Sequence, residues 1–72
     1  MAPRSYEPRR LIHDEALVVI AQAARNGGIV RSAAEAARLA REHPDSGMTP
    51  ADISDKLFRL AVQNRLAVDP SA

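Results

Sequence analysis

The chain has 72 residues with no cysteine, 46% apolar residues, 26% charged residues and a net charge of +1. Its length fits one domain with a small core, and the lack of cysteine excludes disulfides, thiolate zinc sites and thiol catalysis. No apolar run is long enough to span a bilayer, and no segment has the order of a signal peptide. We therefore expect a cytoplasmic protein without a membrane partner.

Charge is distributed unevenly along the chain. Residues 1–10 hold Arg4, Arg9 and Arg10 against one glutamate, which gives +2, whereas the remainder holds seven basic and eight acidic residues, which gives −1. Two prolines interrupt 1–10, so we expect a flexible basic arm there. Basic arms enter the minor groove of DNA in other folds. The alternative is a frayed terminus without a role.

A first helix is expected over about 14–26, where apolar residues recur at helical spacing. Val18 falls among the polar residues of this helix. Gly27 and Gly28 supply a left-handed stop, and a start nearer Pro8 stays open because proline suits the first helical turn. The predicted core face consists of Ala16, Leu17, Ile20, Ala23 and Ala24.

An extended segment over 29–31 and a second helix over 32–43 are expected next. Ser32 and Glu35 stand three apart, as in a capping box, and Pro44 ends the helix. A small-residue face, with Leu39 beside it, allows another helix to approach closely; it consists of Ala33, Ala36, Ala37 and Ala40. Charges that alternate in sign predict a solvated stripe on the opposite side, formed by Arg31, Glu35, Arg38 and Glu42.

The third helix, over 50–64, has the strongest start signal in the sequence. Thr49 suits the N-cap, Pro50 the first helical position, and Asp52 the position three residues after the cap. The predicted core face is Ile53, Leu57, Leu60 and Ala61. We expect residues 66–68 to be extended and residues 70–72 to fray. The sequence thus predicts one mostly all-α, three-helix domain over 11–69, in which 29–31 can pair with 66–68.

The order of these elements resembles the front part of a winged-helix domain, a variant of the helix-turn-helix. The stretch "TPADISDKLFRLAVQNRLAV" is similar to the family's capped helix, which continues with a β-branched residue and serine, leucines three apart and a closing strand. The resemblance implies that the third helix lies in the major groove of DNA. Three features depart from the pattern: Asp52 and Asp55 near the helix start, the long turn "EHPDSG", and the end of the chain where a second wing strand should follow. We therefore expect no wing.

The outward side of the third helix carries two sets of candidate residues. Lys56, Arg59 and Gln63 could contact DNA bases, and the alternative is a solvated face of mixed charge. Phe58 and Val62 lie one turn apart. With Ala51 in line and Val18 from the first helix, they could form an exposed apolar ridge that docks a protein partner or a second copy. The alternative is a core that wraps far enough to bury Phe58.

No catalytic or ligand-binding pattern is present. His13 and His43 have no second ligand at a metal-binding spacing, and Ser32 and Thr49 are explained as caps. We expect no enzyme activity, no cofactor and no small-molecule ligand. Two functions remain as hypotheses: a small regulatory module that binds duplex DNA through the third helix and the arginine arm, and a protein-interaction or homodimer module that uses the apolar ridge.

Overall fold

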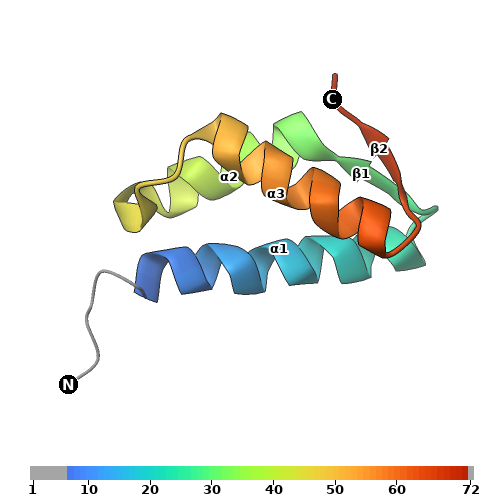
Figure 1. The fold of residues 1–72 in the computed structure, drawn as a ribbon, viewed down its shortest axis with the longest axis horizontal. Coiled ribbons are helices and arrows are strands. Elements are labelled where there is room, and N and C mark those ends of the chain that lie inside the picture. The colour runs from blue at the N-terminus through green and yellow to red at the C-terminus, as the bar shows by residue number, and fades with distance from the viewer. Residues whose placement is uncertain (1–6, 72) are drawn as a thin grey trace.

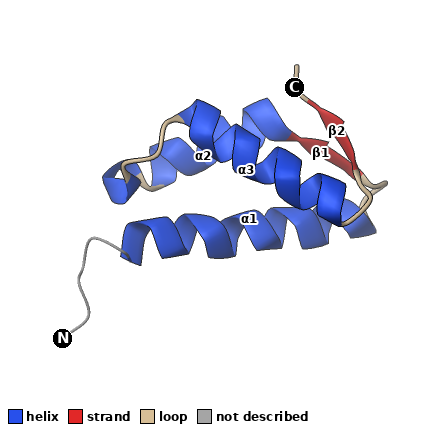
Figure 2. Ribbon diagram, in the orientation of Figure 1, coloured by secondary structure: helices blue, strands red, loops and turns tan. Residues whose placement is uncertain are grey.

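The structure is a computed structural model, and it describes residues 7–71. The elements follow the order α1 (Glu7–Arg25), β1 (Ile29–Arg31), α2 (Ser32–Glu42), the 3₁₀ turn η2 (Pro44–Ser46), α3 (Pro50–Gln63) and β2 (Ala67–Asp69). Helices α2 and α3 lie together on one side of α1, and the two strands lie at the end where α1 and α3 finish (Figure 1). The mostly helical three-helix class is confirmed (Figure 2).

Helix α1 begins at Glu7 rather than near 14. The prediction of a flexible arm is therefore wrong for residues 7–10, while 1–6 lie outside the described residues. Pro8 is compatible with the first turn, because the amide hydrogen that proline lacks has no helical partner there. The earlier start also adds Ile12, which is fully buried, one turn before Ala16.

The buried face of α1 is rotated from the predicted one. Leu17 and Ala24 are exposed, although we expected both in the core. The physical reason is the added turn at the start, because a face that includes Ile12 is centred near Ala16 and Ala23, and Leu17 and Ala24 lie about 100° around the helix from it. The residues that α1 buries are Ile12, Ala16, Val19, Ile20 and Ala23.

The start predicted for α2 is wrong in its details. Ser32 is the first helical residue and is buried, and the N-cap position falls on Arg31, whose side chain makes no capping hydrogen bond. Glu35 instead accepts a hydrogen bond from Arg38 Nε at 2.9 Å, and Arg38 Nη1 donates to Glu42 at 3.1 Å. The hydrogen bond to Glu35 raises the pKa of Arg38 despite some burial. The stripe of alternating charge is thus confirmed for these three residues.

The core lies between the three helices and β1. Helix α2 contributes Ala36 and Leu39, and it packs mainly against α3. Ala33 is exposed, so the small-residue face is narrower than predicted. Helix α3 buries Ile53, Leu57 and Ala61, as predicted, with Leu60 half-buried against the same core.

The two short strands form a parallel pair at one end of the helices. Ile29, Val30 and Arg31 align with Ala67, Val68 and Asp69, respectively. This pairing confirms the predicted partner segments, with the second strand one residue later than expected. Val30 is buried, so the pair anchors the end of α3 to the core.

The start of α3 is the reciprocal capping box that the sequence indicates. The Asp52 amide donates to Thr49 Oγ1 at 3.1 Å, and the Thr49 amide donates to Asp52 Oδ2 at 3.0 Å. Two amides that the helix leaves without a carbonyl partner are therefore satisfied.

Removing this cap should weaken the fold. We expect Thr49→Ala to lower the free energy of unfolding by about 1 kcal/mol, because a helix N-cap contributes roughly 0.5–2 kcal/mol. Urea denaturation followed by circular dichroism measures the change. Thr49→Ser keeps the hydroxyl and is the matched control, so equal losses in both variants would contradict the capping account.

The ends of α1 and α3 share one backbone motif with different residues. After α1, Gly27 has a φ of 102°, and the Gly28 amide donates to the Ala23 carbonyl at 2.7 Å. After α3, Arg65 has a φ of 58°, and the Leu66 amide donates to the Ala61 carbonyl at 2.8 Å. Both are Schellman endings, in which glycine is the residue of least strain. Arg65 is the one non-glycine residue with a positive φ between residues 7 and 71.

Relief of this strain should stabilise the protein. We expect Arg65→Gly to raise the free energy of unfolding by about 0.5–1 kcal/mol, because relief of left-handed strain exceeds the added entropy of an unfolded glycine. Gly27→Ala is the matched control, and we expect it to lower the free energy of unfolding. Urea denaturation measures the free energy of unfolding of both variants. A lower value for Arg65→Gly than for the wild type would contradict the inference that the backbone of Arg65 is strained.

Candidate functional site

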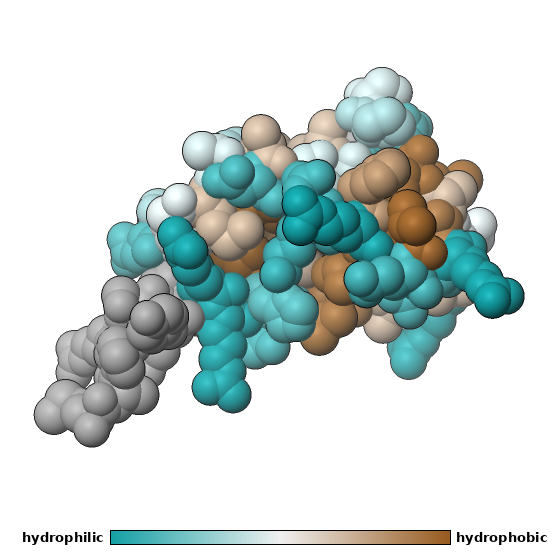
Figure 3. All heavy atoms as spheres, viewed as in Figure 1, coloured by the Kyte–Doolittle hydropathy of each residue, from teal (hydrophilic) through white to brown (hydrophobic). Residues whose placement is uncertain are grey.

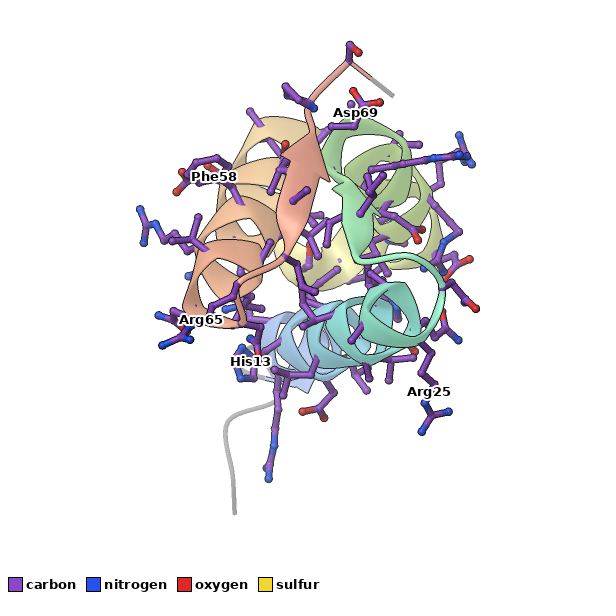
Figure 4. The ribbon with its side chains drawn as sticks, turned by 90° about the vertical axis from the view of Figure 1, so that its right-hand side faces the viewer. His13, Arg25, Phe58, Arg65 and Asp69 are labelled. Carbon is purple, nitrogen blue, oxygen red and sulfur yellow. The ribbon has the colours of Figure 1, made fainter. Side chains whose placement is uncertain are left out.

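The main candidate site is the side of α3 that faces away from the core. Phe58 and Val62 are 51% and 57% exposed, respectively, so Phe58 is not enclosed by the core. Ala51 and Asp55 are also exposed on this helix, and Figure 4 shows Phe58 and Arg65 projecting from its outer side. We call this set the α3 outer face; it consists of Ala51, Asp55, Phe58, Val62 and Arg65.

The α3 outer face is apolar at its centre and charged at its borders. Asp55 lies one turn before Phe58, and Val62 lies one turn after it. Arg65 follows in the turn that ends the helix. Apolar area lies over the second half of α3 and over β2, next to polar side chains (Figure 3). An exposed aromatic beside an aliphatic residue, bordered by charges, is typical of a protein contact.

A second candidate site is an open groove between α1 and α3. It brings together Lys56, Arg59 and Gln63, the three third-helix residues predicted to contact DNA. Two carboxylates line the same groove, because Asp52 caps the helix and Asp55 pairs with Arg59 Nη2 at 2.7 Å. The other residues of the groove are His13, Met48 and Leu60.

The arginines predicted for the arm do not join this groove as a set. Arg9 lies on α1, and its Nε donates to the Ser46 carbonyl at 3.3 Å, which ties α1 to η2. Arg10 is an exposed residue of α1. Arg4 lies outside the described residues. The prediction that Arg9 and Arg10 belong to a free arm is therefore wrong.

Val18 does not belong to the same surface as Phe58. It is 48% exposed, as expected, but the residues two positions to either side, Ala16 and Ile20, are both fully or almost fully buried. A separation of two residues turns a helix by about 200°, so Val18 lies on the side of α1 opposite the core. The four residues predicted to form one apolar ridge therefore do not form one surface. Ala51, Phe58 and Val62 share a face of α3, and Val18 lies apart from them on α1.

A further groove lies where the end of α1 meets the strands and α2. Ile29 and Arg31 line it from β1, with Glu35 from α2 and Asp69 from β2. Hydrogen bonds from the Ser71 hydroxyl and amide lower the pKa of Asp69, and Arg31 adds a smaller favourable charge interaction. Ile29 is 54% exposed, and no motif in the sequence indicated this groove.

Other ligand classes find little support in the described residues. Between residues 7 and 71, no three His, Cys, Asp or Glu side chains gather as a metal site requires. None of the helices in this range combines the length and the apolar content needed to cross a membrane. His13 is exposed in the α1–α3 groove, and His43 is half-buried after α2.

Arg65 is the residue of the α3 outer face that the sequence did not single out. The sequence feature that could have indicated Arg65 is its place directly after Asn64, where α3 ends and a glycine would suit the turn.

Comparison with family models, curated proteins and solved structures found no match to this chain.

Proposed function

We propose that this protein is a small, non-enzymatic interaction module that binds another polypeptide through the α3 outer face. The observation that carries the proposal is the half-exposed Phe58 with the exposed Val62 on the same face of a helix whose opposite face is fully buried. Association would bury this apolar area, and removing apolar surface from water is favourable. The charges at its borders, Asp55 and Arg65, would give the contact orientation.

Site-directed photo-crosslinking tests this proposal. The photoreactive residue benzoylphenylalanine replaces Phe58 in one sample and Val18 in another, and the full chain is irradiated in the cells that produce it. We expect protein adducts from position 58 and none from position 18, because only position 58 lies on the α3 outer face. Equal adduct formation at both positions, or none at either, would overturn the proposal.

Binding of duplex DNA through the α1–α3 groove is the second candidate function. The observation in its favour is that Lys56, Arg59 and Gln63 line one groove. The carboxylates of Asp52 and Asp55 in the same groove weaken the attraction for phosphates, and the Arg59 charge is already paired. Since nucleic-acid affinity depends mainly on neutralised phosphates, this candidate ranks below protein binding.

The two candidate functions differ in their response to salt. If duplex DNA binds, amide resonances of Lys56, Arg59 and Gln63 should shift at low salt, and the shifts should fall steeply as salt is raised. We expect no such shifts in a titration of the ¹⁵N-labelled full chain with a random-sequence duplex. Salt-dependent shifts confined to this groove would instead favour the DNA candidate.

A further inference from the structure

We propose that the polypeptide bound by the α3 outer face is a second copy of this chain, with the two α3 helices antiparallel. This inference rests on the proposed function and specifies its partner. The spacing and charges of the five residues that form the face, and the backbone of one of them, favour this pairing.

The residues of the α3 outer face have the spacing of a helix-pairing stripe. Ala51, Asp55, Phe58, Val62 and Arg65 are separated by four, three, four and three residues. This alternation keeps side chains on one side of a helix and is the repeat through which two helices pair. The helical part, Pro50–Gln63, has 14 residues and is about 21 Å long. It holds Asp55 and the two apolar layers, and Arg65 follows in the left-handed turn directly after the helix.

An antiparallel arrangement makes this stripe complementary to itself. If Phe58 lies opposite the partner's Val62, the same two-fold symmetry places Val62 opposite the partner's Phe58. Asp55 then falls opposite the partner's Arg65, and Arg65 opposite the partner's Asp55. The Asp55 Oδ2 atom already pairs with Arg59 Nη2 of the same helix at 2.7 Å, and the second carboxylate oxygen can accept from the partner's Arg65. Apolar residues thus meet at the centre, and opposite charges meet at both ends.

The parallel arrangement lacks this complementarity. Each residue would then lie opposite its own copy, so that Asp55 faces the partner's Asp55 and Arg65 faces the partner's Arg65. Like charges placed across an interface oppose association. The order of charges along α3 therefore selects the antiparallel pair.

The backbone of Arg65 gives an independent reason for a side chain at this position. Arg65 takes a left-handed conformation at a helix end where the corresponding position after α1 is Gly27. A strained non-glycine residue points to a function of its side chain. The antiparallel pair supplies that function, because the arginine meets a carboxylate of the second copy.

The area available sets the strength expected of the dimer. A pair of single helices of this length buries less than the interfaces of stable complexes, which bury roughly 1,200–2,000 Å². We therefore expect a weak, reversible dimer with a dissociation constant of roughly 0.1 mM. Monomer and dimer should exchange over ordinary laboratory concentrations.

Sedimentation equilibrium of the full chain tests the pairing through charge reversal. We expect the wild type to dimerise between about 10 µM and 1 mM, as a low-area interface implies. Asp55→Arg and Arg65→Asp should each weaken dimerisation by at least about tenfold, because each places like charges at both ends. The double variant restores opposite charges, and it should recover the wild-type dissociation constant to within about threefold.

Two controls separate charge pairing from loss of folding. Asp45→Arg makes the same change on η2, away from α3, and should leave the dissociation constant unchanged. Thermal unfolding of every variant checks the fold, and Asp tolerates the left-handed backbone at position 65. Arg65→Asp leaves the Asp55–Arg59 pair intact, so this single variant tests the charged layer by itself if Asp55→Arg unfolds the helix.

The results distinguish failure of this inference from failure of the proposed function. A wild type that stays monomeric at 1 mM, or a double variant no better than the single ones, overturns the antiparallel dimer. If position 58 still forms adducts with a different protein, the proposed function survives that result. If position 58 forms no protein adduct and the chain is monomeric, both are overturned.

Discussion

Replacement of Leu57 by alanine should lower the free energy of unfolding by about 2–5 kcal/mol. Leu57 is fully buried in α3, where the three helices meet. Truncation of a buried leucine costs about 2–5 kcal/mol, since it removes apolar contacts and leaves a cavity. A chain of this size has a total stability of roughly 4–11 kcal/mol, so the loss is a large share of it. Urea denaturation measured by circular dichroism gives the change in the free energy of unfolding.

Leu17→Ala is the matched control for this prediction. The sequence placed Leu17 in the core, whereas the structure leaves it 44% exposed on α1. We expect a loss below about 1 kcal/mol, because a half-exposed side chain gives up less apolar burial and leaves no closed cavity. A loss as large as that of Leu57→Ala would contradict the observed rotation of α1.

Replacement of Phe58 by aspartate should weaken self-association by at least about tenfold while the helical fold remains. Each dimer loses two aromatic contacts, and full burial of one phenylalanine contributes about 1.5–3 kcal/mol. Half of each ring is still exposed in the monomer, so association gains about half of that value for each ring. A factor of ten in the dissociation constant corresponds to about 1.4 kcal/mol. Sedimentation equilibrium measures the constant, with circular dichroism to verify folding.

Val18→Asp provides a matched substitution for this second prediction. Val18 is exposed to nearly the same extent as Phe58 but lies on the opposite side of α1 from the core. We expect its dissociation constant to equal that of the wild type. Equal weakening by the two substitutions would show that the interface is not confined to α3.

Local signals were the part of the fold that the sequence could predict well. The capping box of α3 depends on Thr49 and Asp52, three residues apart, and needs no tertiary contact to form. The stop after α1 depends on Gly27 and Gly28, which both have a positive φ, and it also needs no distant contact. Both appear in the structure as predicted, because each is decided within one helical turn.

Features that depend on neighbouring elements could not be predicted from the same patterns. Ser32 looked like an N-cap, but β1 runs directly into α2, so the helix already includes Ser32 at its first position. The start of α1 depends on packing of Ile12 against the other helices. The sequence does not show this contact, so a helix beginning near 14 was equally consistent with the pattern. That later start led us to place Leu17 and Ala24 in the core, where the structure does not have them.

The candidate site shows the same division. The displacement of Phe58 and Val62 from the Ile53 and Leu57 face could be predicted, because it is a property of one helix. The same pattern left burial of Phe58 open, and the structure shows both residues exposed. Their separation from Val18 required the packing of α1. Arg65 could be singled out only from its backbone φ of 58°, since an arginine directly after a helix is common in sequences.

The most direct test of the account is an isotope-filtered NMR measurement of contacts between copies. A mixture of ¹³C-labelled and unlabelled full chain, at a concentration above the dissociation constant, reports only nuclear Overhauser effects between different molecules. We expect cross-peaks from the Phe58 ring of one copy to the Val62 methyl groups of the other. Absence of these cross-peaks in a sample that sedimentation shows to be dimeric would contradict pairing through the α3 outer face.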